Sequence, residues 1–225
     1  MCVPKTARWI EPLRRTLARV YGPTTRTPVP WLLSADVALT LQGVDTETDP
    51  DSIEFRAISP VAAAYFALFM RPFEAPLTRA TILYRPENSA PPSECWRSNP
   101  HQRVVSWSDG ERTCWLGRWS VDGTIVQVLY EMHEQGTRSD PLSLAARTCT
   151  FKRVHFEDMQ VPVVPLEFLL ADSALRAETR RTSRILHALR AYGHNNAHLK
   201  LALSTLPTGR ASRLMRLLEF SLVAG

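Results

Sequence analysis

Residues 32–55, LLSADVALTLQGVDTETDPDSIEF, contain the residue types of a phosphate-handling site in the order in which such a site uses them. A buried strand leads through small residues into a short helix, whose first N–H groups are suited to an anion. An acidic strand follows, and carboxylates on a strand hold the divalent cations that accompany phosphates. The layout indicates phosphate chemistry, but several residues that would perform it are replaced by others.

Arginine is the second candidate for contact with phosphates. Only three of the 27 basic residues are lysines, which leaves 24 arginines in a chain of net charge +5. Guanidinium groups suit phosphates, although a GC-rich genome also raises the arginine content. We predict a nucleic-acid-binding face in the basic C-terminal part, formed by Arg180, Arg181, Arg184, Arg210, Arg213 and Arg216. The alternative is that the last helix packs on its own domain with its arginines solvated.

Alternating and helical patterns predict the elements that position these residues. Strands are expected at 29–33, 52–58 and 79–85, hairpins at 113–132 and 152–166, and a loop or lid at 86–103. Helices are expected at 5–20, 36–43, 59–71, 165–175, 177–193, 195–205 and 208–223. Asp36 is expected to cap the second helix and Gly43 to end it, Ser59 to cap the third, and Asp122-Gly123 to form the turn of the first hairpin.

The order of these elements, with LQGV after the second helix, VDG at the hairpin turn and a later VPVVPLEF, resembles a known family. It is similar to the bacterial nucleotidyltransferase-fold proteins of the polymerase β superfamily over roughly residues 28–190. The resemblance implies an α/β (α+β) fold, with a nucleotidyltransferase-like mixed sheet flanked by helices and followed by a C-terminal helical region. We expect a core with an N-terminal helix at 1–165 and a basic helical region at 166–225.

In that family a Gly-Ser pair ends the first strand, and its backbone N–H groups hold the nucleotide phosphates. The resemblance places the nucleotide-binding positions of this chain at Ser34, Ala35 and Asp36. Alanine restricts the turn that glycine permits, and a carboxylate repels a triphosphate. Asp36 is therefore expected to cap the helix rather than to serve chemistry.

The family's three catalytic carboxylates correspond to Ser52, Glu54 and Gln127. The first two match an Asp-x-Asp pair, whose side chains share one face of a strand and hold two Mg²⁺ ions. An amide is a weak Mg²⁺ ligand and a poor base. Only Glu54 remains, as a weak metal ligand, so we expect no cofactor, or Mg²⁺ only if the protein is active.

These positions lead to three hypotheses. The first is a nucleotidyltransferase-like protein that has lost metal-dependent transfer and binds a protein partner, a nucleotide or nucleic acid. The second is an active enzyme that adds a nucleoside monophosphate to a protein, tRNA or small molecule, with a metal site rebuilt from Glu54, Asp49 and Asp51, although Pro50 favours a loop there. The third is a helical nucleic-acid-binding module on an α/β scaffold.

Other motifs have a functional and a structural interpretation. His194 and His198 have the spacing of a metal pair on one helix face, or are exposed polar residues at a helix start. Glu167 matches a Leu-Glu pair of the family, or stabilises the start of a helix. Four tryptophans either stack a base or fill the core: Trp96, Trp107, Trp115 and Trp119.

Several classes of protein are not indicated by the sequence. No apolar run approaches the roughly 20 residues that cross a bilayer, and the N-terminal residues do not have the pattern of a signal peptide. The four cysteines, Cys2, Cys95, Cys114 and Cys149, contain no Cys-x-x-Cys pair, which argues against a disulfide framework or a thiolate zinc site. We expect a cytoplasmic protein that does not bind a membrane.

Overall fold

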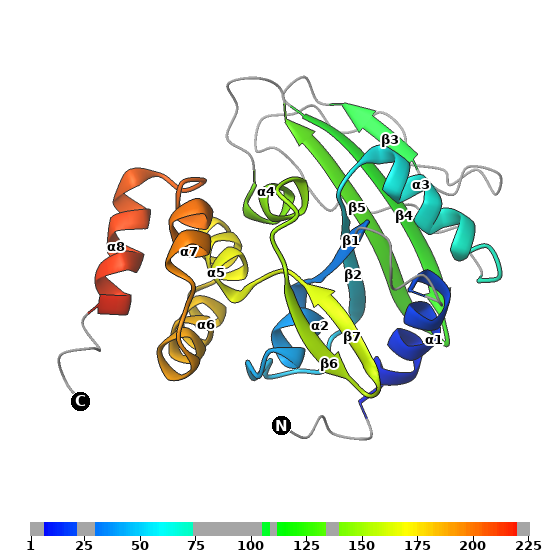
Figure 1. Cartoon of the computed structure of the whole chain (residues 1–225), viewed down its shortest axis with the longest axis horizontal. Helices are drawn as coiled ribbons and strands as arrows, with labels where there is room; N and C mark the ends of the chain where they lie inside the picture. The colour runs from blue at the N-terminus through cyan, green and yellow to red at the C-terminus, as the bar shows by residue number, and fades with distance from the viewer. Residues whose placement is uncertain (1–6, 22–29, 74–104, 109–111, 134–139, 220–225) are drawn as a thin grey trace.

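One mixed sheet forms the centre of the fold in the computed structural model, which describes residues 7–21, 30–73, 105–108, 112–133 and 140–219 (Figure 1). Within these ranges seven strands lie in the order β3-β4-β5-β2-β1-β7-β6. The strands are β1 (Trp31–Ser34), β2 (Ser52–Ala57), β3 (Val105–Ser108), β4 (Arg112–Val121), β5 (Thr124–His133), β6 (Lys152–Phe156) and β7 (Met159–Val163). The predicted α/β class, a mixed sheet flanked by helices, is confirmed.

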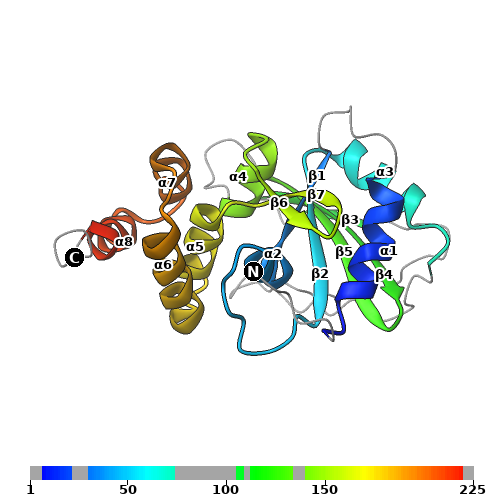
Figure 2. The ribbon, with the colours of Figure 1, turned by 60° about the horizontal axis from the view of Figure 1, so that its bottom comes forward.

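Helices cover both faces of the sheet and then continue beyond it. They are α1 (Ile10–Val20), α2 (Ala35–Leu41), α3 (Pro60–Phe69), α4 (Pro141–Arg147), α5 (Leu166–Leu175), α6 (Thr179–Tyr192), α7 (Asn196–Leu203) and α8 (Thr208–Glu219). Helices α1 and α3 contact one face through β4 and β5, while α2 and α4 contact the other face through β1 and β2. Figure 2 shows α5 to α8 gathered to one side of the sheet, which is the expected C-terminal helical region.

The sheet register decides which side chains can meet. β2 pairs with β1 in the antiparallel sense and with β5 in the parallel sense, so that Glu54 lies opposite both Ser34 and Gln127. Residues opposite each other in a ladder share one face of the sheet. The register therefore gathers Ser34, Glu54 and Gln127 on the face that α2 and α4 cover.

The other face of β2 is apolar and fills the core. Ile53 and Phe55 are both fully buried. The ring centroids of Phe55 and Phe66 of α3 are 5.0 Å apart, and Phe66 also lies 5.6 Å from Trp119 of β4. Burial of such aromatic side chains stabilises the sheet against α1 and α3. The strict alternation of β2 thus separates an aromatic core from a polar layer.

Most local signals in the sequence have the predicted effect. The Ser59 hydroxyl accepts the N–H of Ala62 and caps α3, which begins at Pro60. Asp122 and Gly123 both have positive φ, at 49° and 80°, and join β4 to β5. Pro12 does not interrupt α1, because it lies in the first turn, where its missing N–H would have no partner in the helix.

The structure corrects the prediction for the start of α2 and adds two elements. The N-cap is Ser34, whose side chain makes no capping hydrogen bond, and Asp36 lies inside the first turn. Strand β3 and helix α4 were not predicted, while the predicted strand at 79–85 and loop at 86–103 lie outside the described residues. No helix within the described residues has both the length and the apolar character to cross a membrane.

Replacement of Ala35 by glycine is expected to stabilise the protein. Ala35 has φ of 54° at the turn from β1 into α2, and a left-handed conformation costs an L-residue about 1–2 kcal/mol. Glycine removes this strain but adds about 0.4–1 kcal/mol of unfolded-state entropy, so Ala35→Gly should raise the unfolding free energy in urea by about 0.5–1 kcal/mol. The matched change Ala64→Gly, on the exposed side of α3, should lower it by about 1 kcal/mol. A loss of stability from both changes would contradict the left-handed turn.

Candidate functional site

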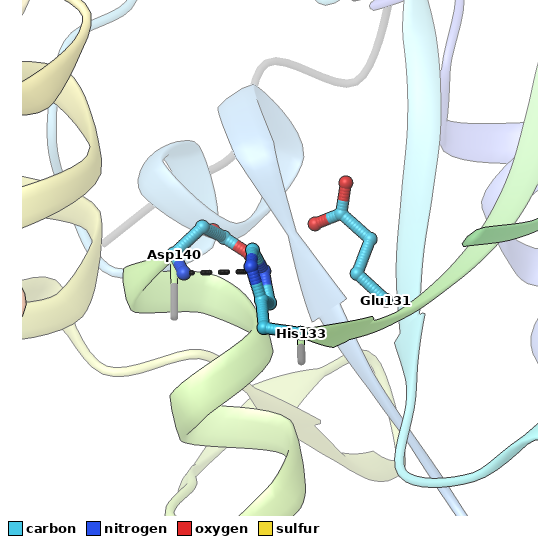
Figure 3. A group of neighbouring side chains, drawn as sticks. All are labelled: Glu131, His133 and Asp140. Atoms are coloured by element: carbon cyan, nitrogen blue, oxygen red, sulfur yellow. Dashed lines mark hydrogen bonds between the residues drawn. The ribbon is translucent and has the colours of Figure 1, made fainter. Parts of the chain in front are cut away.

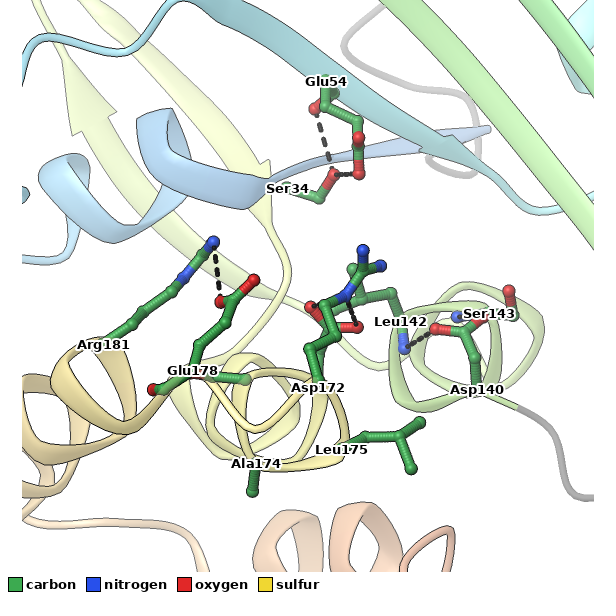
Figure 4. A network of polar contacts seen from close by, with 12 residues as sticks. Ser34, Glu54, Asp140, Leu142, Ser143, Asp172, Ala174, Leu175, Glu178 and Arg181 are labelled. Carbon is green, nitrogen blue, oxygen red and sulfur yellow. Dashed lines mark hydrogen bonds and ion pairs between the residues drawn. The ribbon is translucent and has the colours of Figure 1, made fainter. Parts of the chain in front are cut away.

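Glu54 is the centre of a hydrogen-bonded network on the polar face of the sheet. Its Oε1 accepts the Ser34 hydroxyl at 2.9 Å and Arg56 Nε at 3.1 Å, and its Oε2 accepts Gln127 Nε2 at 2.7 Å (Figure 4 shows the Ser34 contact). Gln127 Oε1 in turn accepts Arg118 Nε at 3.1 Å. The carboxylate is therefore bonded by three donors of the protein itself, from β1, β2 and β5.

Arg56 is a buried cation held between two carboxylates. It is only 3% exposed. Its Nε lies 3.1 Å from Glu54 Oε1, and its Nη1 lies 3.0 Å from Glu131 Oε2. Glu131 also accepts the Ser143 hydroxyl of α4 at 2.9 Å. A buried charge is tolerated when it is paired and hydrogen-bonded, and Arg56 meets that requirement through partners on β2 and β5.

The pKa of Glu54 lies below its usual value. Burial acts to raise this pKa, but the Arg56 guanidinium and the hydrogen bonds from Ser34 and Gln127 favour the charged form and outweigh it. Glu54 is thus a stable carboxylate at neutral pH. Three donors already occupy most of its lone-pair positions, and a carboxylate with a lowered pKa is a poor general base.

Two further carboxyl groups, Glu131 and Asp140, influence each other. Burial raises the pKa of Glu131 to about 7; Arg56 opposes the rise and Asp140 adds to it. Burial also acts to raise the pKa of Asp140, but Arg56 and the hydrogen bonds that Asp140 receives lower it to about 2. Like charges in one buried site cannot both ionise freely, and Glu131 is the member that takes up a proton.

Helix α5 adds a second ion pair beside this network. Arg176 Nε lies 3.1 Å and 3.2 Å from the two carboxylate oxygens of Asp172. Burial raises the pKa of Asp172, although Arg176 opposes the rise. Figure 4 shows Asp172 on the side of α5 that faces Asp140 and α4. The polar layer between the sheet and the helices therefore contains both signs of charge.

The structure brings two of the three expected catalytic positions into contact. Glu54 and Gln127 are directly hydrogen-bonded, and Ser52 lies on the same face of β2, two residues from Glu54 and opposite Ile125. Asp49 and Asp51 are exposed and precede the first residue of β2. The alternative Asp-x-Asp pair thus lies in a loop, as the intervening proline indicated.

The expected nucleotide-binding positions are engaged with other groups. The Ser34 hydroxyl donates to Glu54 instead of capping α2, and Ala35 adopts the conformation that the family's glycine would favour. Asp36 Oδ1 lies 3.2 Å from Arg181 Nη2 of α6. The predicted capping role of Asp36 is wrong, because its neighbour Ser34 is the N-cap and its own carboxylate points to an arginine.

Four of the six predicted nucleic-acid-binding arginines have partners within the protein: Arg180, Arg181, Arg184 and, as described below, Arg210. Arg181 contacts Asp36 and Glu178, and Arg184 pairs with Glu47. Arg180 Nη1 lies 4.0 Å from Glu47, at the edge of ion-pair distance. These groups line a cavity of about 460 Å³ that also contains Asp45 and Thr179. Its lining contains four carboxylates for three guanidinium groups, which does not favour an anion.

Helix α8 packs on its own domain, which was the alternative to a nucleic-acid-binding face. Leu214 and Leu218 of α8 are buried, while Arg213 and Arg216 are exposed. Arg210 Nη1 donates to the carbonyl oxygens of Ala174 and Leu175, at 3.1 Å and 3.0 Å, and so satisfies the C-terminal end of α5. The sequence of α8 is thus explained by an apolar face that packs on the domain and by arginines on its other side. Nucleic-acid binding by these arginines stays a prediction.

The remaining motifs have structural partners. His194 precedes the N-cap Asn195 of α7, so it does not share a helix face with His198. Glu167 Oε1 accepts the N–H of Asn195 at 2.7 Å. Trp119 is fully buried in the core, and the rings of Trp115 and Tyr130 are 5.2 Å apart. Trp96 and the side chain of Trp107 lie outside the described residues.

Two of the four cysteines lie within the described residues, and Cys114 Sγ donates to Glu131 Oε1 at 3.7 Å. Cys114 is buried, and Cys149 is exposed. Cys2 and Cys95 lie outside the described residues.

Sequence reasoning did not identify Arg56 and Glu131 as members of the site. Arg56 follows Glu54 by two residues and so shares its face, which was a usable signal. Glu131 follows Gln127 by four residues on β5 and lies on the same face for the same reason. Neither position was expected to be buried, because α4, which covers that face, was not predicted.

Comparison with known proteins finds a similarity of fold. No family model and no curated protein matches the sequence. The crystal structure at 1.87 Å resolution of a candidate nucleotidyltransferase from Thermotoga maritima is similar over 77% of this chain and 92% of that chain, with 19% sequence identity and a TM-score of 0.46. A similarity at this level says nothing about activity. The structure itself has the predicted architecture, a mixed sheet flanked by helices.

Loss of the Arg56 charge is expected to destabilise the protein severely. Arg56→Met leaves Glu54 and Glu131 buried without their shared cation, and removal of one partner from a buried ion pair costs about 3–5 kcal/mol. The unfolding free energy in urea should fall by that amount, while Arg180→Met, at a side chain that is 87% exposed, should change it by less than about 0.5 kcal/mol. If Arg56→Met does not fold, Arg56→Lys, which keeps a charge but cannot contact both carboxylates, should still be destabilised. Equal stability of the Arg56 and Arg180 variants would disprove the buried network.

The contribution of Glu54 should disappear in acid. Its folded pKa lies below the ordinary value of 4.5, so its stabilisation is present above that pH and is lost as the pH falls through the folded pKa. The difference in unfolding free energy between the wild type and Glu54→Gln should therefore be largest near pH 7 and shrink below pH 4.5. Urea titrations across this range measure it. A difference that grows on acidification would mean that Glu54 is protonated in the folded protein.

Proposed function

We propose that this chain is a nucleotidyltransferase-like protein that does not catalyse metal-dependent nucleotidyl transfer and acts by binding a protein partner, a nucleotide or nucleic acid. The observation that carries the proposal is the Arg56 guanidinium between Glu54 and Glu131. A cation of the protein itself stands beside the one carboxylate that remains at the expected catalytic positions.

The bonding of Glu54 argues against Mg²⁺ in particular. Mg²⁺ demands near-octahedral oxygen ligands and is usually held by one or two carboxylates together with waters and substrate phosphates. Glu54 already accepts from Ser34, Arg56 and Gln127. A metal ion would have to displace Arg56, which would leave Glu131 without its buried partner. Two-metal catalysis needs at least two carboxylates to bridge the ions, and Ser52 and Gln127 supply none.

The same region suits a phosphate-bearing partner that needs no metal. Arg118 is half-buried, and burial lowers its pKa although Glu54 opposes this. An anion beside such a desolvated guanidinium would be favourable. Arg176 is the second candidate, because its side chain is 44% exposed and its charge also favours ionised Glu54. A nucleotide or nucleic-acid phosphate is therefore a chemically suitable ligand for these two arginines.

Wild-type protein is expected to transfer no label from nucleoside triphosphates in the presence of Mg²⁺ or Mn²⁺. Labelled ATP, GTP, CTP and UTP are incubated with the full chain, with tRNA and with a cell extract as acceptors. Binding of ATP, measured by calorimetry, should change little between Mg²⁺ and EDTA, because no metal bridges nucleotide and protein. Metal-dependent transfer that Glu54→Gln abolishes would overturn the proposal and support the active enzyme.

Restoring carboxylates should restore metal binding at the same place. The double variant Ser52→Asp with Gln127→Asp puts three acids on one face of β2 and β5, so its affinity for Mn²⁺ should rise by at least about ten-fold, which corresponds to about 1.4 kcal/mol. The control variant Ser52→Asn with Gln127→Asn has side chains of the same size without charge and should not gain affinity. Calorimetric Mn²⁺ titrations compare the two. Equal affinities would show that the geometry of this face is not that of a metal site.

A further inference from the structure

The end of β5 and the start of α4 bring three metal-ligand side chains together. Glu131, His133 and Asp140 each offer one ligand atom, and these atoms all lie within 4.8 Å of one another (Figure 3). This cluster is separate from the Ser52, Glu54 and Gln127 positions, because Arg56 lies between Glu54 and Glu131.

The backbone holds the three side chains in defined places. Glu131 and His133 are two residues apart on β5 and so share one face of the strand. Asp140 is the N-cap of α4, where Oδ1 accepts the N–H of Leu142 at 3.0 Å and Oδ2 accepts that of Ser143 at 3.2 Å. Each carboxylate oxygen has two lone pairs, so these bonds leave Asp140 able to bind a cation as well.

The distances are compatible with a small dication after a modest adjustment. Zinc lies about 2.0–2.2 Å from imidazole nitrogen and carboxylate oxygen. Ligand atoms at the widest printed spacing, 4.8 Å, would each have to move inward by roughly 0.6 Å to reach that distance. Rotamer adjustments of this size do not require the backbone of β5 or α4 to move.

The formal charges in this layer also favour a cation. Four carboxyl groups interact electrostatically with Arg56 in the buried layer, namely Glu54, Glu131, Asp140 and Asp172, and Arg176 is a second guanidinium group beside Asp172. The sum is two negative charges when all four are ionised, and one negative charge when Glu131 carries a proton. Uncompensated charge is expensive in a buried layer. A dication bound to Glu131 would replace that proton as the compensating charge.

We propose that Glu131, His133 and Asp140 bind one transition-metal dication of the Zn²⁺ or Mn²⁺ type, which clamps the end of β5 to the start of α4. One imidazole with two carboxylates suits these ions better than Mg²⁺, which prefers oxygen ligands alone. The ion has a structural role, and its binding does not depend on whether the protein transfers nucleotides.

Metal titration of the full chain tests the site. Protein freed of metal with EDTA is titrated with ZnCl₂, MnCl₂ and MgCl₂ by calorimetry, and with CoCl₂ by visible absorption, which reports direct ligation. The wild type should bind one equivalent of Zn²⁺ more tightly than Mg²⁺ and melt at a higher temperature with Zn²⁺. Asp140→Asn, which keeps a good N-cap, and His133→Asn should each weaken Zn²⁺ binding by at least about ten-fold, because loss of even a supporting contact costs that much.

A matched control separates this cluster from the other histidines. The double variant His194→Asn with His198→Asn removes the pair near α7 and should bind Zn²⁺ as the wild type does. Circular dichroism checks that each variant is folded, and if His133→Asn is not, Asp140→Asn decides the question. The proposal is overturned if the wild type binds no stoichiometric Zn²⁺, if Asp140→Asn binds it undiminished, or if affinity is lost in the His194 and His198 variant instead.

Discussion

The buried guanidinium of Arg56 is the interaction on which the polar half of this structure depends. It is 3% exposed and lies within 3.1 Å of Glu54 and 3.0 Å of Glu131. An unpaired buried charge is very unfavourable. Arg56 can therefore be buried only if β2 and β5 pair in the register that brings both carboxylates to it. Ser143 of α4 bonds to Glu131 as well, so the constraint extends to the helix that covers the sheet.

This constraint is also the basis of our proposal that the chain does not catalyse metal-dependent transfer. The fold places Ser34, Glu54 and Gln127 around one point of the sheet, but there they satisfy one another. A fully bonded polar network in a low-dielectric layer is rigid and resists rearrangement. Groups that must change partners during a reaction would have to break these bonds first.

The sequence predicts the elements better than the site, for a physical reason. Strand alternation, the Ser59-Pro60 cap and the Asp122-Gly123 turn are local signals, and the structure has each of them. The burial of Arg56 is not local. Its face of β2 has the polar pattern of a solvated face, and it becomes an interior layer because α2 and α4 lie over it. The N-cap of α2 is a second example of a non-local effect. The residue type favours Asp36 as the cap, but the N-cap is Ser34, and its hydroxyl donates to Glu54 of the neighbouring strand instead of capping the helix.

The parallel pairing of β2 with β5 has a consequence for the order in which the chain folds. Arg56 and Glu131 are 75 residues apart in the sequence, and Gln127 is 73 residues from Glu54. Contacts of such separation form slowly, since a long loop must close before they are made. During synthesis Arg56 leaves the ribosome well before its second carboxylate exists, so it stays hydrated until β5 arrives. Closure of the polar layer is thus expected to be a late step of folding, made only by a chain that has been translated beyond Glu131.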